Sequence, residues 1–215
     1  MPDFVQHEEL YRGQDIVANR SNKHIVVFGV GALGSWIIDL LVRQGYNNLT
    51  VVDFDRVEQS NCGTQNYGLR DVGRKKSTIT ATNVYLKFGV KIEAIDKKIT
   101  HDNVNSIVKN ANLLIDVFDN PESRQVIKNV ATKFKIPCLH AGMSANGFAQ
   151  IEWNETYQIY YSALTNENQP CEYPLAANLV HITSSIVAEI INKFVDHGIK
   201  KSVHFTLNDL KVDIL

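Results

Sequence analysis

The stretch 25–35, which reads Ile-Val-Val-Phe-Gly-Val-Gly-Ala-Leu-Gly-Ser, constrains the fold more than any other part of this chain. Its β-branched and aromatic start is typical of a buried parallel strand, and apolar residues then recur at helical spacing. Between them, Gly29 permits a tight turn, Gly31 permits close approach of a phosphate, and Gly34 permits close helix–strand packing. The amides at the helix start form a ready phosphate site. The alternative is a glycine-rich turn without a ligand.

A second apolar stretch, 49–53, follows Gly45 and reads as the next strand of a βαβ unit. It ends on Asp53, and an acid about 20 residues after a glycine turn is the usual partner of a ribose hydroxyl. A further buried strand, 111–116, is followed by a second group of acids that ends at Asp119. Ligands of open α/β sheets bind at the carboxyl ends of strands, so both acids are candidates for a nucleotide site.

Composition narrows the class of protein. The chain has 215 residues, of which 44% are hydrophobic and 21% charged, with a formal net charge of -1. This near-neutral balance predicts neither a nucleic acid nor a membrane as the main partner. No apolar run is long enough to span a bilayer, and the N-terminus lacks a signal-peptide pattern. Three widely spaced cysteines favour reduced thiols and a cytoplasmic location, and the lack of a CxxC pair excludes a four-cysteine zinc site.

The pattern along the chain predicts an α/β fold, namely a Rossmann-like, doubly wound, mainly parallel sheet that antiparallel strands extend in the C-terminal third. We expect one unit over 1–215, with an N-terminal arm (1–22), a nucleotide-binding core (23–140), and an antiparallel extension with a C-terminal helix (141–215). The arm should hold a short helix that ends near Val17. An irregular loop over 54–76 should be followed by the remaining elements. These are helices at 77–88, 103–109, 121–134 and 176–195, and strands at 90–95, 111–116, 136–140, 147–153, 157–162 and 201–207.

Three further motifs carry a family resemblance. They are Asp53-x-Asp55-x-Val57-Glu58-x-Ser60-Asn61, then Gly73-x-x-Lys76, then Asp116-x-x-Asp119-Asn120 with Arg124. Together with the glycine turn, they resemble in order and spacing the ThiF/MoeB family of ubiquitin-activating-enzyme-like adenylating proteins, from about residue 10 to residue 195. The resemblance implies a homodimer that binds ATP and transfers AMP to a carboxylate. That acceptor is often the C-terminus of a ubiquitin-like sulfur-carrier protein, and a small biosynthetic acid is the other possibility.

The resemblance also implies a role for each matching residue. Asp53 would hold the ribose, Lys76 would contact the phosphates, and Asp119 would ligate Mg²⁺, for which one Asp with several waters is a normal arrangement. Arg12 would reach across the dimer to the phosphates. The remaining nucleotide contacts would come from Gly29, Gly31, Ala32, Leu33, Gly34, Asp55, Asn61, Gln65 and Asn120. Both reactants are anionic, so such a site must screen charge and hold them in line.

Each of these roles has a plainer alternative. Asn120 could simply cap the helix that begins at Pro121. Lys76 could be a solvated lysine at a helix start, and Arg12 a mobile surface arginine. Arg124 and Asp116 read as structural, because the first lies on a helix and the second in a strand.

Thr64 departs from the family pattern, which carries an arginine at this position. A hydroxyl cannot replace a guanidinium that neutralises phosphate charge through two hydrogen bonds. Either Arg56, Arg70 or Arg74 supplies the charge, or turnover is slow, or the protein binds nucleotide without activating much.

The cysteines bear on a further step, the formation of a thioester or persulfide. Cys171 lies in the polar loop 165–174, where an exposed thiol could attack an adenylate, although neighbouring Glu172 would raise its pKa. Cys138 reads as a core residue, and Cys62 as lining the nucleotide pocket. His181 is expected to pack rather than to ligate a metal.

Three classes of function remain. The leading one is an ATP-dependent adenylyltransferase, and the second is a weakly active or non-catalytic nucleotide-binding subunit, which Thr64 favours. The third is an NAD(P)-dependent oxidoreductase, because the βαβ unit and Asp53 suit NAD equally well. The loop that ends at Asn61 and the pair Asp119-Asn120 have no role in hydride transfer, so the third ranks last.

Overall fold

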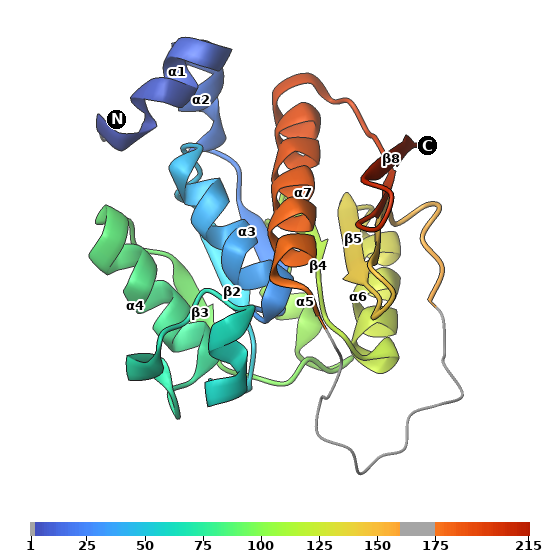
Figure 1. Cartoon of the computed structure of the whole chain (residues 1–215). Helices are drawn as coiled ribbons and strands as arrows, with labels where there is room; N and C mark the ends of the chain where they lie inside the picture. Colours follow the sequence, from blue (N-terminus) through green and yellow to red (C-terminus); the bar gives the residue numbers. More distant parts are fainter. Residues whose placement is uncertain (1–2, 160–174) are drawn as a thin grey trace.

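The computed structural model describes residues 3–159 and 175–215, and one eight-stranded sheet runs through this part of the chain (Figure 1). The strand order is β3-β2-β1-β4-β5-β6-β7-β8. The strands β3, β2, β1, β4 and β5 are neighbours in this order, and each neighbouring pair among them is parallel. The strands β6, β7 and β8 then continue the sheet with antiparallel pairing. The strands are β1 Ile25–Phe28, β2 Leu49–Val52, β3 Glu93–Ile95, β4 Leu113–Asp116, β5 Cys138–Met143, β6 Phe148–Trp153, β7 Val203–Thr206 and β8 Lys211–Ile214. The predicted doubly wound sheet with an antiparallel extension is confirmed.

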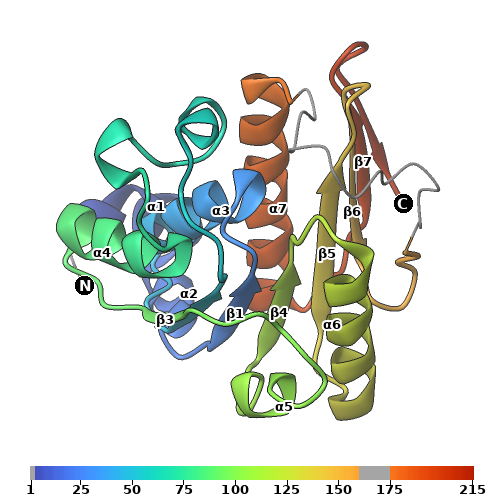
Figure 2. The same ribbon diagram turned by 90° about the horizontal axis from the view of Figure 1, so that it is seen from below.

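Helices cover both faces of this sheet (Figure 2). One face carries α3 (Ala32–Arg43), α4 (Lys76–Phe88) and α7 (Ala177–His197), and the other carries α5 (Val104–Ile107) and α6 (Pro121–Phe134). Right-handed crossovers explain this division, because α3 and α4 follow β1 and β2 toward one edge, whereas α6 follows β4 toward the other.

The strands β1, β2 and β4 are buried at every residue, as their unbroken apolar sequences predict. Alternate side chains enter two separate cores. Ile25 and Val27 pack with α3 and α7, whereas Val26 and Phe28 pack with α5 and α6. The sheet is therefore a rigid divider, and its strand ends are held in fixed relative positions.

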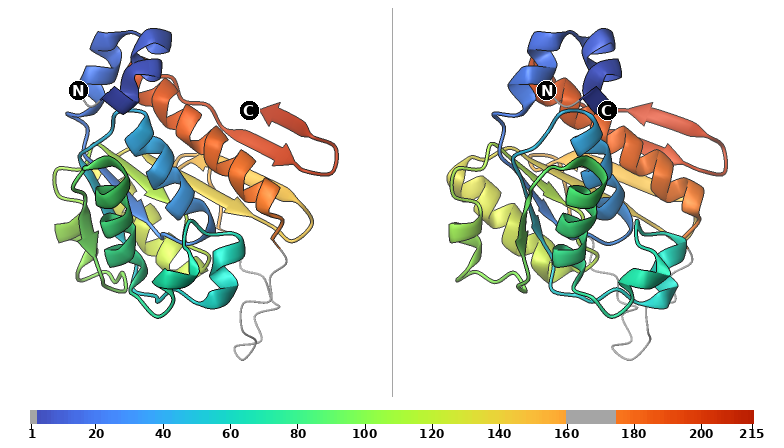
Figure 3. Two further views of the ribbon diagram at one scale, coloured as in Figure 1. Left: turned by 60° about the vertical axis from the view of Figure 1, so that its left-hand side comes forward. Right: turned by 90° about the vertical axis from the view of Figure 1, so that its left-hand side faces the viewer.

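The N-terminal arm differs from the single helix that the sequence predicts. It forms two helices, α1 (Gln6–Arg12) and α2 (Gln14–Arg20), and the second runs past Val17. Gly13 separates them with φ at +99°, a backbone conformation that side chains rarely tolerate. The arm lies beyond the ends of α3 and α7 (Figure 3).

The C-terminal third differs from the prediction in two places. Tyr157 to Ile159 are not a strand, and residues 160–162 lie outside the described residues. The chain turns there because Lys128 Nζ donates to the carbonyls of Asn154 and Tyr157, at 2.8 and 2.6 Å. The strand β8 was not predicted, since it is short and carries Lys211 and Asp213, residue types that are depleted in strands.

The other elements agree with prediction within a few residues, and α6 matches at both ends. The loop 54–76 is irregular, with two short 3-10 helices, η2 (Gln59–Gly63) and η3 (Leu69–Asp71); a third, η1 (Asp3–Val5), opens the arm. Within residues 3–159 and 175–215, no helix has the length and apolar character needed to cross a bilayer.

Candidate nucleotide-binding site

The glycine turn leaves an open helix start. β1 ends at Phe28, Gly29 takes φ of +92°, and α3 begins at Ala32 with no side chain in the described residues capping its first amides. A Cβ at Gly34 would lie 1.9 Å from the Gly29 carbonyl oxygen, so only glycine allows α3 to approach the turn this closely. The first amides of α3 are therefore uncapped donors at the positive end of a helix, which is the usual setting of a bound phosphate.

The segment 64–67 is held against this turn and the first turns of α3 by hydrogen bonds that involve three of its residues. Trp36 Nε1 donates to the Thr64 carbonyl at 2.9 Å, and the Asn66 amide donates to Ser35 Oγ at 2.9 Å. The Tyr67 hydroxyl donates to the Val30 carbonyl at 2.6 Å. Each bond joins residues about 30 positions apart, so the sequence offered no local signal for these contacts.

Gln65 lies in this closing segment, beside Gly31. Its Oε1 atom is buried and has no hydrogen-bond partner in the part of the chain that the structure describes. A Cβ at Gly31 would lie 4.0 Å from Gln65 Nε2, so the side chain lies next to the glycine turn. An orphaned buried acceptor costs free energy, and a hydroxyl or amino group of a bound nucleotide would satisfy it.

Asp53 follows β2 directly and is 4% exposed. Its Oδ2 atom accepts the Val30 amide and its Oδ1 atom accepts the Asp55 amide, both at 2.8 Å. Burial raises the pKa of Asp53, although the two amide hydrogen bonds act to lower it. A carboxylate has about four acceptor positions, so two remain for ribose hydroxyls.

Lys76 is the first residue of α4 and is 8% exposed, unlike a solvated lysine. Its amide donates to the Asp55 carbonyl at 2.8 Å, and its Nζ atom lies 3.7 Å from Asp55 Oδ2. Ser77 Oγ also donates to the Asp53 carbonyl at 2.9 Å. These contacts hold the start of α4 against the end of β2.

Asp119 lies after β4, the strand next to β1. The Val117 amide donates to the Phe28 carbonyl at 3.0 Å, and a Cβ at Gly29 would lie 3.1 Å from the Phe118 ring. The turn that leads to Asp119 thus borders the glycine turn. The Asp119 carboxylate is exposed and has no recorded hydrogen bond or ion pair within the described ranges. Asn120 Oδ1 accepts the Ser123 amide at 2.8 Å and caps α6, as its plainer interpretation predicts.

Asp116 belongs to a buried polar network, in line with its structural interpretation. It receives a hydrogen bond from His140 Nδ1 at 2.8 Å and lies 3.7 Å from Arg124 Nη1. Burial alone would raise the pKa of Asp116, but the Arg124 charge and the His140 hydrogen bond outweigh it and hold that pKa below its ordinary value. The Tyr157 ring stacks on His140 at 4.2 Å and accepts a hydrogen bond from Arg124 through its hydroxyl. The strands β4 and β5, the helix α6 and the segment after β6 supply these side chains, so no local sequence motif predicts the network.

The possible substitutes for the missing family arginine are directed elsewhere. Arg56 Nη1 donates to the Gly73 carbonyl at 2.7 Å. Arg56 and Arg74 both line a hollow of about 280 Å³ beside α4, and none of its lining residues belongs to the glycine turn. Arg70 is exposed in η3. Asn61 Oδ1 accepts the Glu58 amide at 3.0 Å and so stabilises the loop itself.

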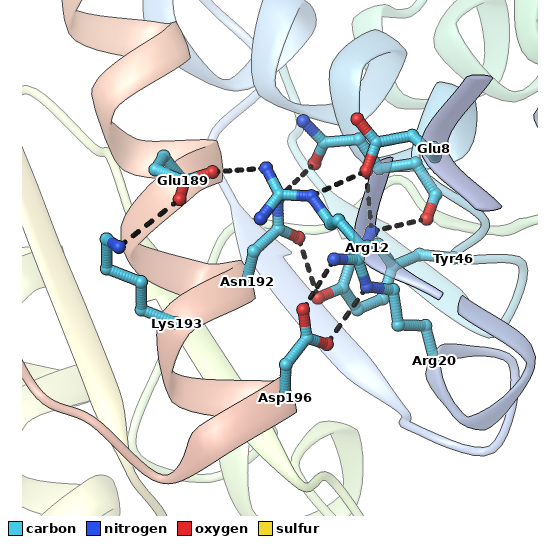
Figure 4. Close-up of polar contacts among 9 residues, drawn as sticks. Glu8, Arg12, Arg20, Tyr46, Glu189, Asn192, Lys193 and Asp196 are labelled. Atoms are coloured by element: carbon cyan, nitrogen blue, oxygen red, sulfur yellow. Dashed lines mark hydrogen bonds and ion pairs between the residues drawn. The ribbon is translucent and has the colours of Figure 1, made fainter. Parts of the chain in front are cut away.

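Arg12 forms ion pairs with carboxylates of its own chain (Figure 4). Its guanidinium binds Glu8 at 2.8 Å and Glu189 at 2.6 Å, so it is not a mobile surface arginine. Ser184 on α7 contacts the glycine turn, because its Oγ atom lies 3.5 Å from the Leu33 carbonyl oxygen. Glu189, which binds Arg12, follows five residues later on α7, and five residues span roughly 7.5 Å along a helix. The role across a dimer stays a prediction.

The predictions for cysteine and histidine are partly resolved. Cys138 is buried in β5, and burial raises the pKa of its thiol, which agrees with a core residue. Cys62 is half-buried in η2, and Cys171 lies outside the described residues. His181 packs against the Trp36 ring at 4.3 Å, as expected. Residues 3–159 and 175–215 hold no cluster of three His, Cys, Asp or Glu that suits a metal.

The mainly parallel sheet, the glycine turn and the acid after β2 define a protein of the Rossmann-type fold class. Residues 9–213 match the ThiF family, and this chain belongs to that family. The sulfur carrier protein ThiS adenylyltransferase of Bacillus subtilis is 30% identical over 119 residues, 54% of this chain and 35% of the relative. The tRNA threonylcarbamoyladenosine dehydratase of Escherichia coli is 29% identical over 125 residues, 57% of this chain and 47% of the relative. The chain spans about half or less of these curated relatives.

Solved structures with the same fold include E. coli MccB with ATP, at a TM-score of 0.81 and 16% identity, over 97% of this chain and 69% of that one. The E. coli dehydratase TcdA superimposes with a TM-score of 0.75 and 17% identity, over 89% of this chain and 93% of that one. At these identities the likeness shows the fold.

Proposed function

We propose that this protein is an ATP-dependent adenylyltransferase that activates a carboxylate as its acyl-adenylate. One observation carries the proposal. The uncapped start of α3 follows β1, which lies between β2 and β4 in the sheet; the chain after β2 leads to the buried Lys76, and the chain after β4 leads to Asp119, whose exposed carboxylate has no partner within the described residues. That arrangement of charge suits a triphosphate with a divalent cation, and a dinucleotide would use neither charged group.

Residues of the site fit ATP by their chemistry. The α3 amides suit phosphate oxygens, Asp53 has acceptor positions left for the ribose, and the orphaned Gln65 oxygen can accept a hydrogen bond. Lys76 adds a positive charge that offsets the repulsion between the two anionic reactants. The names of several relatives, such as ThiS adenylyltransferase, support the same reaction.

In the proposed reaction, a carboxylate oxygen of the acceptor attacks the α-phosphorus of ATP. The new bond joins that oxygen to phosphorus, and the bond between the α-phosphorus and the bridging oxygen breaks. Pyrophosphate leaves with the electron pair, and the acyl-adenylate remains. The protein contributes position and charge neutralisation, which supply most of the catalysis in phosphoryl and nucleotidyl transfer.

Mg²⁺ is part of the proposal, and Asp119 is the residue that would hold it. The Asp119 carboxylate is exposed and has no hydrogen bond to any described residue, and Mg²⁺ commonly takes one or two carboxylates together with phosphates and water. When bound, the ion neutralises charge that develops on the phosphate oxygens.

The acceptor, the assembly and the compartment are also proposals. The acceptor is a carboxylate, either the C-terminus of a ubiquitin-like protein or a small acid, as in the relatives named for sulfur carriers and for the archaeal SAMP. We propose a homodimer in which Arg12 serves the partner's phosphates, and a cytoplasmic location where the free thiols of Cys62 and Cys138 stay reduced.

The test begins with binding. Calorimetry with a non-hydrolysable ATP analogue should show binding that strengthens with Mg²⁺, whereas NADH should not bind. Exchange of labelled pyrophosphate into ATP should then appear when the correct carboxylate is added, for example a sulfur-carrier C-terminal peptide. NADH binding in place of the ATP analogue would overturn the proposal in favour of an oxidoreductase.

A second candidate, a nucleotide-binding but weakly active partner subunit, is favoured by one observation. Thr64 occupies the position of the family arginine, and Arg56 and Arg74 line the hollow beside α4, whose lining includes no residue of the glycine turn. Binding of the ATP analogue without pyrophosphate exchange for any carboxylate supports this candidate. Thr64→Arg is the matched variant, because the hydrogen bond from Trp36 Nε1 goes to the backbone carbonyl of Thr64, which the substitution keeps. Exchange that appears only in Thr64→Arg would show that the missing charge limits the reaction.

A further inference from the structure

The hollow beside α4 is a second concave site, separate from the candidate nucleotide site. Its volume of about 280 Å³ is close to the lower limit of about 300 Å³ for small-molecule pockets. Three cations, Arg56, Arg74 and Lys75, line it together with the hydroxyl-bearing Thr78 and Thr82. Within residues 3–159 and 175–215, no acid and no residue of the glycine turn lines it. A hollow lined by charges of one sign attracts ligands of the opposite sign, here anions.

Backbone hydrogen bonds and a buried apolar cluster fix the shape of this hollow. The Val57 amide donates to the Arg74 carbonyl at 2.9 Å, and the Gly73 amide donates to the Val57 carbonyl at 2.8 Å. These bonds hold the two ends of the loop 54–76 against each other. Ile79, which lines the hollow from α4, belongs to the same buried cluster as Val57. A ligand would therefore meet walls that are already ordered, which lowers the entropy cost of binding.

The two guanidiniums of the hollow have no carboxylate partner among the described residues. Arg74 is exposed, and its side chain has no recorded hydrogen bond or ion pair within the described ranges. Arg56 Nη1 donates to the Gly73 carbonyl at 2.7 Å, so most of its N–H groups remain for a ligand. Lys75 differs, because its ammonium pairs with Asp96, which does not line the hollow. Arg56 and Arg74 thus supply positive charge that no described acid neutralises.

The chemistry of these donors favours a phosphate group over a single carboxylate. A guanidinium matches two phosphate oxygens through parallel hydrogen bonds, and two arginines can hold one phosphate from two sides. A phosphate monoester carries about −1.5 to −2 charge at pH 7, which balances two guanidiniums, whereas a carboxylate balances one. The Thr78 hydroxyl has no recorded partner among the described residues and can donate to a further oxygen.

We propose that the hollow beside α4 is a second anion site, which binds a phosphate group, free or carried by a small molecule. Arg56 and Arg74 hold the phosphate oxygens, and Thr78 adds a hydroxyl donor. The site goes beyond the proposed adenylyltransferase reaction and does not depend on it. Its volume is many times the roughly 30 Å³ that one water occupies, so the hollow has room for more than a phosphate ion. A small phosphate ester is therefore the expected ligand.

Calorimetry with inorganic phosphate and with ribose 5-phosphate tests the site. Wild type should bind at least one of them with a Kd of about 1 mM or lower. Arg74→Gln should bind about tenfold or more weakly, because a charge-assisted hydrogen bond is lost, and Arg74→Lys should lie between the two. Tighter binding of ribose 5-phosphate identifies a small phosphate ester as the ligand, and equal binding identifies the free anion.

The variant Arg74→Gln should keep the wild-type fold, since the Arg74 side chain has no recorded bond to a described residue, and circular dichroism checks this. The matched control is Lys133→Gln, which removes an exposed cation from α6 and should bind both probes as wild type does. No binding of either probe to wild type, or equal binding by wild type and Arg74→Gln, would overturn the proposal.

A second pair of measurements separates this site from the glycine turn. Lys76→Met should bind ribose 5-phosphate as wild type does, because Lys76 does not line the hollow. Phosphate binding that is lost in Lys76→Met and kept in Arg74→Gln would place the anion at the glycine turn and overturn the proposal. The two proposals can also fail separately. If the ATP analogue does not bind to wild type but Arg74→Gln still weakens phosphate binding, the adenylyltransferase proposal fails and the anion site stands.

Discussion

The backbone amide of Val30 donates to Asp53 Oδ2 at 2.8 Å, and this bond joins the glycine turn after β1 to the end of β2. Val30 lies between Gly29 and Gly31, so the carboxylate fixes the shape of the turn from outside it. Its other oxygen accepts the Asp55 amide at 2.8 Å and shapes the loop that leads to Lys76. One buried carboxylate therefore orders both sides of the candidate site and still has acceptor positions for a ribose.

Asp53→Ala is expected to weaken adenine-nucleotide binding by about 1–3 kcal/mol, the range for loss of a charged hydrogen bond and of the support for the turn. Calorimetry measures the change. Asp53→Asn should lose less, because one side-chain oxygen still accepts an amide, and the exposed Asp102→Ala should bind as wild type. Unchanged binding in Asp53→Ala would place the ribose elsewhere.

Asp119→Ala is expected to abolish Mg²⁺-ATP-dependent activity while the fold stays intact, because the wild-type carboxylate has no hydrogen bond to lose in the described residues. The measurement is nucleotide binding with Mg²⁺ and with EDTA, together with pyrophosphate exchange. The variant should bind equally in both conditions, whereas Asp102→Ala should keep the Mg²⁺ effect. Wild-type exchange in Asp119→Ala would remove this residue from the metal role.

Lys76→Met is expected to reduce affinity for ATP more than affinity for adenosine, because the ammonium acts on phosphates. A hydrogen bond to a charged group contributes about 1.5–3 kcal/mol, and methionine fills a similar buried volume. Calorimetry with both ligands checks this, with exposed Lys133→Met as the control. An equal loss for ATP and adenosine would point to a structural role for Lys76.

Asp39 on α3 should contribute stability that depends on pH. It accepts Arg43 Nε at 2.7 Å and Lys87 Nζ at 2.9 Å. Burial alone would raise the pKa of Asp39, but these two cations outweigh it and hold that pKa below its ordinary value. The stability is therefore present above the unfolded-state pKa of about 3.9 and is lost as the pH falls through the lower folded-state pKa.

Urea unfolding across pH tests this with Asp39→Asn. The free energy of unfolding should be lower than that of wild type by about 1 kcal/mol at pH 7, since both cations are partly exposed to solvent. The difference should shrink below about pH 4, because Asp39 then becomes protonated first in the unfolded state and, at still lower pH, in the folded state. A difference that stays constant from pH 7 to pH 2 would mean that packing, rather than charge, holds Asp39.

Much of the fold could be predicted because its signals are local. The apolar stretches of β1, β2 and β4 mark buried strands, and Asn120 before Pro121 marks the start of α6. The break at Gly13 and the strand β8 were missed. The first helix pair is stabilised by distant residues, since the Arg20 guanidinium binds Asp196 and the Gln44 carbonyl. The strand β8 is short and carries Lys211 and Asp213, so its local signal is weak.

By itself, the sequence determined the order of strands and helices, the glycine turn and the acid that follows β2, because each depends on the spacing of neighbouring residues. Only the tertiary structure decided that Thr64, Asn66 and Tyr67 close against the turn, and that Lys76 is buried. It also decided that Arg12 binds Glu189 within its own chain. The reason is physical. Periodicity and turn chemistry act over a few residues, whereas these contacts depend on how the sheet brings distant segments together.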